Sequence, residues 1–218
     1  MSSVRAASKP IPPAIRGPFF DCVWDLAWGG SFFRVSMPGE GKLFERFGRG
    51  SESSHRHGLV LLWLMAGAYR FNEVARLRFD QVDWLGSTVQ VQRSKNGLNP
   101  SRTIDRNLID ATLAWRKRFS IASELVMPNR SGGELSCNVF NRDVMGPLGE
   151  LFGIKLSTHS MRDTASQELL RIAEQRGLGI KAVQESLGHR NLNSTETYLR
   201  KQKVGEICID LSTIGAIE

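Results

Sequence analysis

Hydrophobic positions recur with a helical period through the last third of the chain, residues 157–200. A helix that begins near Thr158 or Ser160 would carry apolar residues three or four positions apart on one face. This core-facing stripe consists of Met161, Ala165, Leu169 and Ile172. A second helix is expected to end near Gly188, and residues 193–196 have the form of a capping box that begins a third. The pattern therefore predicts a series of short amphipathic helices.

An earlier stretch, residues 58–68, is apolar on every side, which predicts a helix buried on most of its surface. This helix is expected to break at Gly67, and a second helix is expected over residues 69–77. Further along, Val89 and Val91 alternate with glutamines, as in a half-buried β-strand. Three strands are predicted, over residues 78–84, 88–93 and 102–105.

Two more helices, over residues 108–119 and 137–152, complete the predicted elements. The fold class is α+β, mainly helical, with a small three-stranded antiparallel sheet. The predicted organisation is an N-terminal extension, a main domain and a C-terminal tail. Their ranges are 1–57, 58–200 and 201–218.

The N-terminal extension differs from the rest of the chain in composition. Residues 1–18 are rich in proline, which predicts a flexible lead. Six aromatic residues follow within residues 19–34. This cluster either packs on the main body or offers a surface to another subunit or to DNA. Residues 36–57 are rich in glycine, serine and charge and are predicted to form a loop.

Composition narrows the classes of function. A net charge of +7 favours an acidic partner, nucleic acid first, although a basic protein without a polyanionic partner has the same charge. The three cysteines are widely spaced, as expected of reduced thiols in a cytoplasm. The longest apolar run is too short to cross a bilayer, and no signal peptide is visible, so the expected protein is soluble and intracellular. His55 and His57 lack nearby carboxylates or thiols, and no metal site is predicted.

Four polar residues in the last third could serve a phosphoryl-transfer site: His159, Arg162, His189 and Tyr198. His159 and Arg162 are three positions apart, so one helical face can carry both. Arg162 lies beside the apolar stripe, where packing can hold its guanidinium and still let it reach a ligand. The motif HSMR, followed by LGHRNLNSTETY with its histidine and tyrosine nine positions apart, resembles the tyrosine recombinase family, also called the phage integrases. The fold expected from this resemblance is the tyrosine recombinase catalytic domain.

The resemblance implies catalytic residues upstream as well. The stretch GAYRFNEVARL looks like the family's first arginine motif, with Arg70 at a helix start and Glu73 three residues later. In isolation such a pair is usually a surface ion pair. Lys95 stands where the family carries its catalytic lysine, and Arg93 is the alternative. Asp163 replaces a residue that is often histidine in the family, and with Glu73 it is expected to support the catalytic groups.

In the mechanism that the resemblance implies, Arg70 and Arg162 hold the phosphoryl oxygens and His189 adds a donor. Tyr198 attacks with His159 as its base, and Lys95 protonates the leaving 5′ oxygen, giving a 3′-phosphotyrosyl enzyme. No cofactor is expected, since the intermediate keeps the energy of the broken bond, and the chain has no GxxxxGK[ST] loop. Contacts with DNA are assigned to Arg93, Arg102, Arg116, Lys117 and Arg190.

The implied activity is site-specific recombination: integration, excision or inversion by a homo-tetramer on double-stranded DNA, in the cytoplasm at the nucleoid. A type IB topoisomerase or a catalytically silent DNA-binding regulator are the alternatives. Residues 1–57 are too short for the family's usual helical DNA-clamping domain. The chain is thus expected to be a minimal member similar to the fimbrial-type invertases, a fragment, or dependent on an accessory DNA-binding protein. The tail is expected to dock on a neighbouring subunit or on its own domain.

Overall fold

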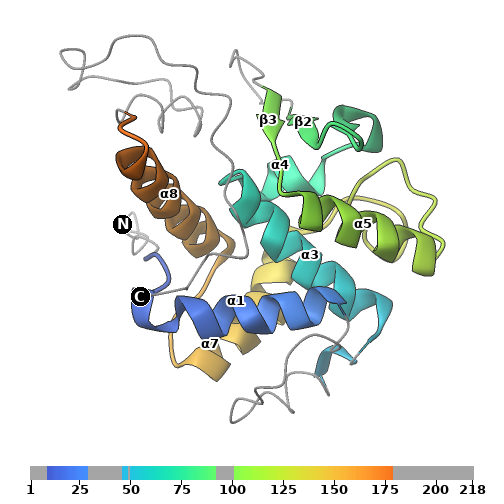
Figure 1. Cartoon of the computed structure of the whole chain (residues 1–218). Helices are drawn as coiled ribbons and strands as arrows, with labels where there is room; N and C mark the ends of the chain where they lie inside the picture. The colour runs from blue at the N-terminus through green and yellow to red at the C-terminus, as the bar shows by residue number, and fades with distance from the viewer. Residues whose placement is uncertain (1–8, 29–45, 49, 92–100, 179–218) are drawn as a thin grey trace, which may run out of the picture.

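The computed structural model describes residues 9–28, 46–48, 50–91 and 101–178. Helix α3 (Glu52–Ala66) runs through the middle of this part, packed against α1 (Pro13–Trp28), α5 (Arg106–Arg118) and α8 (Thr158–Gln175) (Figure 1). Every residue of α3 from Gly58 to Ala66 is buried, which confirms the predicted buried helix. The helix is covered on several sides because its apolar residues point in all directions.

Helix α3 begins at Glu52, earlier than predicted, so the predicted loop over residues 36–57 is wrong at its end. The Ser51 hydroxyl caps the helix by accepting a hydrogen bond from the Ser54 amide at 3.1 Å. Polar residues of the first turns, among them His55 and Arg56, are themselves buried. Because these residues are polar, the sequence pattern did not predict that they begin the buried helix. The predicted domain boundary between residues 57 and 58 falls within α3.

Helix α1 contradicts the predicted flexible lead over residues 13–18, while residues 1–8 lie outside the described ranges. Pro13 occupies the first helical position, where no amide donor is needed, and Pro18 is exposed within the helix. Phe19 and Phe20 are fully buried in the core shared with α3, so the described part of the aromatic cluster packs on the main body as predicted. Burial of these rings outweighs the unfavourable prolines.

The small sheet has the predicted antiparallel pairing, in the order β1-β2-β3. Its strands are β1 (Val82–Asp83), β2 (Thr88–Gln90) and β3 (Ser101–Thr103), each shorter than predicted. Val89 pairs with Val82 on one side and with Arg102 on the other. A 3₁₀ turn, Phe79–Gln81, takes the place of the start of the first predicted strand.

Within the described ranges, the remaining helices follow the predicted positions; the helices predicted to end near Gly188 and to begin at residues 193–196 lie outside those ranges. Helix α4 (Phe71–Ala75) comes shortly after α3, and α5 begins after the cap Asp105. The predicted helix over residues 137–152 is α6 (Cys137–Phe140) and α7 (Gly146–Phe152), joined by a π-helical turn, Asn141–Met145. The stripe of α8 faces the core, with Met161, Ala165 and Leu169 buried. Within the described ranges, no helix combines the length and the apolar character that a membrane span requires.

A half-buried histidine of α3, His57, predicts how stability depends on pH. His57 lies between the rings of Phe47 and Phe140, with ring centroids 5.2 and 5.9 Å away. Burial is the largest of the effects that lower its pKa from 6.5 to about 4, the charges of Arg56 and Arg130 lower it further, and Asp143 opposes them. Between pH 6.5 and about 4, His57 is therefore protonated in the unfolded chain and neutral in the folded one, so a falling pH favours unfolding.

The free energy of unfolding should consequently be highest above pH 6.5 and fall as the pH drops toward 4, with His57 contributing about 3 kcal/mol to the fall. Urea denaturation at pH 7.0, 5.5 and 4.5 measures this change. In the variant His57→Phe, which keeps an aromatic ring in the same place, the decrease should be smaller by most of that contribution. An equal decrease in both proteins would contradict the assignment to His57.

Candidate active site

Arg70 and Glu73 lie at the end of α3, where the chain turns into α4. Gly67 caps α3, and the Tyr69 amide donates to the Leu64 carbonyl at 3.0 Å. Arg70 is the N-cap of α4, and the Glu73 carboxylate accepts from the Arg70 amide at 2.8 Å and from its guanidinium at 3.1 Å. The Arg70 side chain is 50% exposed. Its guanidinium is thus held by Glu73 and still open to a ligand.

Arg162 reaches the same place from α8. It is only 7% exposed, and its guanidinium donates to the Ala68 carbonyl. The same guanidinium nitrogen lies 4.0 Å from the Glu73 carboxylate. Glu73 therefore stands between two arginines that are far apart in the sequence. Two guanidiniums around one carboxylate leave a net positive charge, which favours an anionic ligand.

A third arginine fixes the turn that carries Arg70. Arg102, on β3, donates to the Gly67 carbonyl and lies over the Tyr69 ring, 5.2 Å from its centroid. A Cβ atom at Gly67 would meet this ring at 2.2 Å, so the tight turn requires glycine. The carbonyls of Gly67 and Ala68 are each held by a guanidinium, one from the sheet and one from α8. These contacts were not predictable from the sequence, because they join segments without a shared local pattern. The assignment of Arg102 to DNA stays a prediction.

His159 stands at the start of α8, one turn before Arg162, and is exposed. The hydroxyl of Ser157 caps the helix by accepting from the Ser160 amide, and the Thr158 amide donates to the Asn141 side chain at 2.9 Å. These bonds fix the first turn, and the histidine is open to solvent. Asp163, the next residue after Arg162, is half-buried.

Five of the residues assigned from the sequence lie outside the described ranges. They are Arg93, Lys95, His189, Arg190 and Tyr198. The described part of the candidate site therefore consists of Arg70, Glu73 and Arg162, with His159 one helical turn from Arg162. Among the described residues, no group of three or more histidine, cysteine or acidic side chains could hold a metal ion.

The cations assigned to DNA near the end of α5 have different surroundings. Arg116 donates to the backbone carbonyls of Ser123 and Leu125, both at 2.6 Å, and lies 4.7 Å from the centroid of the Phe79 ring. Lys117 is exposed. In the structure Arg116 fixes the loop that follows α5, and the assignment of both residues to DNA stays a prediction.

A family model described as the phage integrase family matches residues 43–204. The tyrosine recombinase XerA of Thermococcus kodakarensis is 28% identical over 149 residues, covering 66% of this chain and 51% of that protein. The chain spans about half the length of the first curated relatives that it matches.

Two solved structures are similar in fold. A crystal structure of XerA recombinase superposes with a TM-score of 0.58 at 17% identity, covering 85% of this chain and 58% of the other. A pre-cleavage complex of the XerH site-specific recombinase with its difH substrate has a TM-score of 0.57 at 16% identity, covering 88% and 50%. At these identities the superpositions support a common fold.

Proposed function

Since this chain belongs to the phage integrase family, we propose that it is a site-specific DNA recombinase that cuts and rejoins strands through a covalent tyrosine intermediate. The observation that carries the proposal is the meeting of Arg70 and Arg162 around Glu73. A surface ion pair of Arg70 and Glu73 needs no third partner. A buried arginine brought from another helix to the same carboxylate is what an anion-binding active site needs.

The two arginines suit the charge that develops during phosphoryl transfer. Negative charge is spread over the non-bridging oxygens in the transition state, so positioning and charge stabilisation account for most of the catalysis. Each guanidinium can donate two parallel hydrogen bonds to such oxygens. Glu73 orients Arg70, and the Ala68 carbonyl orients Arg162, so both donors are in place before DNA binds.

The covalent step follows from the family resemblance. The phenolic oxygen of Tyr198 forms a bond to phosphorus while the bond from phosphorus to the 5′ oxygen breaks. His159 takes the phenolic proton, His189 donates to a phosphoryl oxygen, and Lys95 or Arg93 protonates the leaving 5′ oxygen. The products are a 3′-phosphotyrosyl enzyme and a free 5′ hydroxyl. The reverse reaction with a different 5′ hydroxyl joins new partners without ATP.

Recombination joins two DNA sites, so the proposed active form is a homo-tetramer on double-stranded DNA that integrates, excises or inverts a segment. The complex of the structurally similar XerH with its difH substrate supports DNA as the partner. The helical clamping domain usual in the family would add contacts around the duplex. An accessory DNA-binding protein is one source of such contacts if residues 1–57 do not supply them.

The proposal is tested by trapping the intermediate. The chain is incubated with genomic DNA that flanks its gene, the reaction is stopped with detergent, and DNA attached to protein is sequenced. Attachment at the 3′ phosphates of one defined site supports recombination. Relaxation of any plasmid without preference for a site would select a type IB topoisomerase instead. DNA binding with no attachment would leave the catalytically silent regulator.

A further inference from the structure

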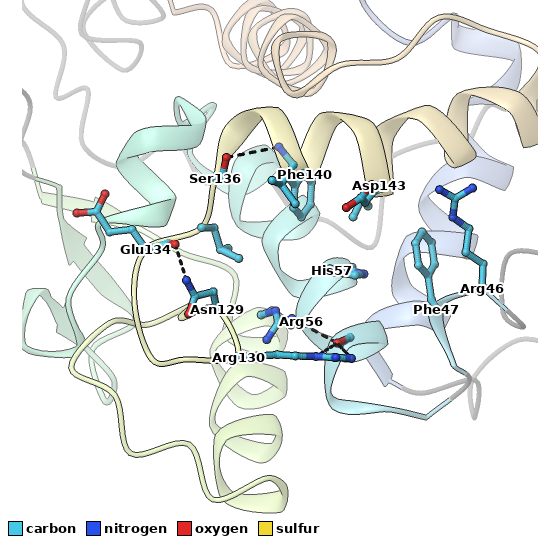
Figure 2. Close-up of a pocket in the computed structure, with 14 residues that line it drawn as sticks. Arg46, Phe47, Arg56, His57, Asn129, Arg130, Glu134, Ser136, Phe140 and Asp143 are labelled. Carbon is cyan, nitrogen blue, oxygen red and sulfur yellow. Dashed lines mark hydrogen bonds between the residues drawn. The ribbon is translucent and has the colours of Figure 1, made fainter.

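A cavity of about 540 Å³ opens beside the first turns of α3, and Arg56, His57 and Arg130 are among the residues that line it (Figure 2). Its walls come from α3, from residues 46–47, from the loop over residues 129–136 and from the helical run over residues 139–144. None of the four described residues of the candidate active site lines it. A cavity of this volume can hold a ligand the size of a nucleotide.

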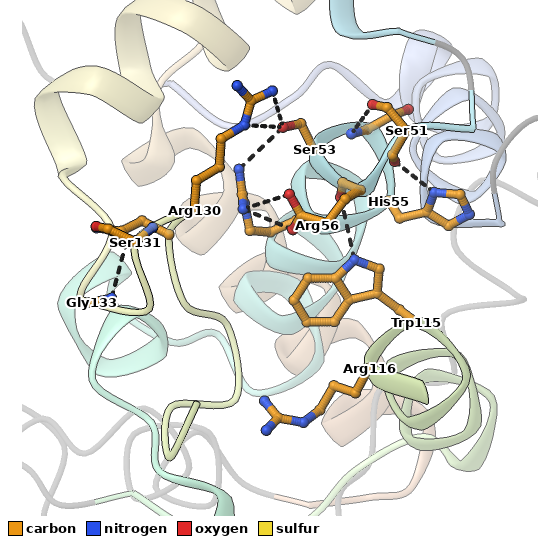
Figure 3. Close-up of polar contacts among 12 residues, drawn as sticks. Ser51, Ser53, His55, Arg56, Trp115, Arg116, Arg130, Ser131 and Gly133 are labelled. Atoms are coloured by element: carbon orange, nitrogen blue, oxygen red, sulfur yellow. Dashed lines mark hydrogen bonds and ion pairs between the residues drawn. The ribbon is translucent and has the colours of Figure 1, made fainter. Parts of the chain in front are cut away.

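Two arginines converge in the cavity on one neutral acceptor. The Ser53 hydroxyl accepts from Arg130 at 3.0 and 3.2 Å and from Arg56 at 3.3 Å (Figure 3). Glu52 balances the charge of Arg56, at 2.8 Å, but the hydroxyl carries no charge to balance Arg130. Burial lowers the pKa of Arg56 most, Glu52 raises it, and repulsion from Arg130 lowers it further. Like charges held this close are stabilised by an anion between them.

Buried donors remain in the cavity after these bonds are counted. Arg56 is 5% exposed, and its Nε atom has no hydrogen-bond partner among the described residues. The Nδ1 atom of His57 is also buried without a partner in the described part of the chain, and it donates in the tautomer that carries its proton on Nδ1. An unsatisfied buried donor costs about 1–3 kcal/mol, so a ligand that accepts from these atoms would recover part of that cost.

The acidic side chains of the cavity are engaged with arginines that do not line it. Glu134 pairs with Arg76 at 2.9 Å, and Asp143 pairs with Arg142 at 2.6 Å. Of the two cavity arginines, Arg56 forms an ion pair with Glu52, at 2.8 Å. Arg130 forms no ion pair with a described residue. The amino-terminal end of α3 adds a further partial positive charge. The cavity is thus electropositive.

The loop that carries Arg130 is fixed before any ligand arrives. The side chain of Asn129 accepts from the amides of Ser131 and Gly133 at 2.9 and 3.0 Å, and it donates to the Glu134 carbonyl at 2.9 Å. On the other side, the Trp115 indole donates to the Glu52 carbonyl at 3.3 Å and holds the start of α3. Both guanidiniums therefore project from braced segments, which lowers the entropic cost of binding.

We propose that this cavity binds a phosphate group, with Arg56 and Arg130 donating to its oxygens and His57 beside them. Guanidiniums match the oxygens of a phosphate in both charge and geometry. The phosphate belongs either to a free nucleotide or to the backbone of DNA. The site is separate from the proposed strand-transfer site and does not depend on that function.

Nuclear magnetic resonance of the histidine rings tests the proposal in the whole chain. Inorganic phosphate is titrated at pH 7 and constant ionic strength, and we expect the His57 signals to shift and saturate. Arg130→Gln should weaken binding at least tenfold. The control Arg106→Gln removes the same charge from an exposed arginine of α5 that pairs with Asp110, and it should bind like the wild type.

Further titrations identify the source of the phosphate. Displacement of inorganic phosphate by AMP but not by a short duplex assigns the site to a free nucleotide. Displacement by the duplex assigns it to the DNA backbone. His57 signals that do not move with phosphate, or that move equally in Arg130→Gln and the wild type, would overturn the proposal. Circular dichroism of each variant verifies that the fold is retained.

Discussion

Tyr198→Phe should abolish the covalent attachment of the chain to DNA while leaving DNA binding unchanged. Phenylalanine keeps the ring and its packing and removes only the oxygen that would bond to phosphorus. Without a nucleophile, the guanidiniums of Arg70 and Arg162 can still hold the phosphate. The measurement uses a duplex nicked close to the site of cleavage, from which a short fragment dissociates after attack and leaves the adduct trapped. Adducts are separated on a denaturing gel and compared with binding in a native gel.

The control for this experiment is the chain's other tyrosine. Tyr69 is buried next to Arg102, and Tyr69→Phe removes a phenolic oxygen while it keeps the ring and the assigned nucleophile Tyr198. It should still form adducts. Persistence of the adduct in Tyr198→Phe would exclude Tyr198 as the nucleophile, and its loss in both variants would point to a general disturbance of the site. The two variants together separate a chemical role from a structural one.

The fold was predictable wherever one type of residue dominated a segment. The apolar run over residues 58–68 has few structures open to it except a buried helix, and α3 confirms it. The alternating valines around Val89 likewise predicted a strand, which is present as β2. The motifs HSMR and LGHRNLNSTETY indicated the family, which is confirmed by the match over residues 43–204. In these cases local pattern and tertiary environment agree.

The errors occurred where burial overrode local preference. The prolines of α1 predicted a flexible lead, but Phe19 and Phe20 pack in the core and hold the helix in place. Helix α3 begins six residues before Gly58 because the Ser51 cap and the Arg56–Glu52 ion pair let polar residues form its first turns. Propensity is a weak guide when tertiary contacts satisfy polar groups.

Contacts between distant segments could not be predicted in detail. The sequence indicated that Arg70 and Arg162 belong to one site, but this came from family resemblance. That Glu73 lies between them, and that Arg102 and Arg162 hold successive carbonyls of the turn, depends on how β3 and α8 pack against the end of α3. The meeting of Arg56 and Arg130 at Ser53 has the same origin. The spacing of residues within one segment does not predict contacts between segments that are far apart in the sequence.

Arg162→Lys should slow covalent attachment by about 10²–10³-fold, the usual effect of removing one donor aimed at transition-state charge. Lysine keeps the positive charge but lacks the planar fork that lets arginine bind the Ala68 carbonyl and a phosphoryl oxygen at once. Affinity for uncut DNA should change much less, because the charge remains and phosphate contacts elsewhere continue to contribute. Rates of adduct formation in a single turnover, measured with enzyme in excess over nicked DNA, separate the two effects.

Arg171→Lys is the matched control, since Arg171 lies on the same helix, is largely exposed and pairs with Glu168 at 3.0 Å away from Glu73. It should react at the rate of the wild type. Thermal unfolding must be followed in both variants, because Arg162 is buried and its replacement can lower stability as well. If Arg162→Lys remains folded at the assay temperature and attaches as fast as Arg171→Lys, the guanidinium of Arg162 does not act on the phosphate. A rate loss in folded Arg162→Lys with unchanged affinity for uncut DNA would assign this guanidinium to the transition state, where its hydrogen bonds are stronger than in the ground state.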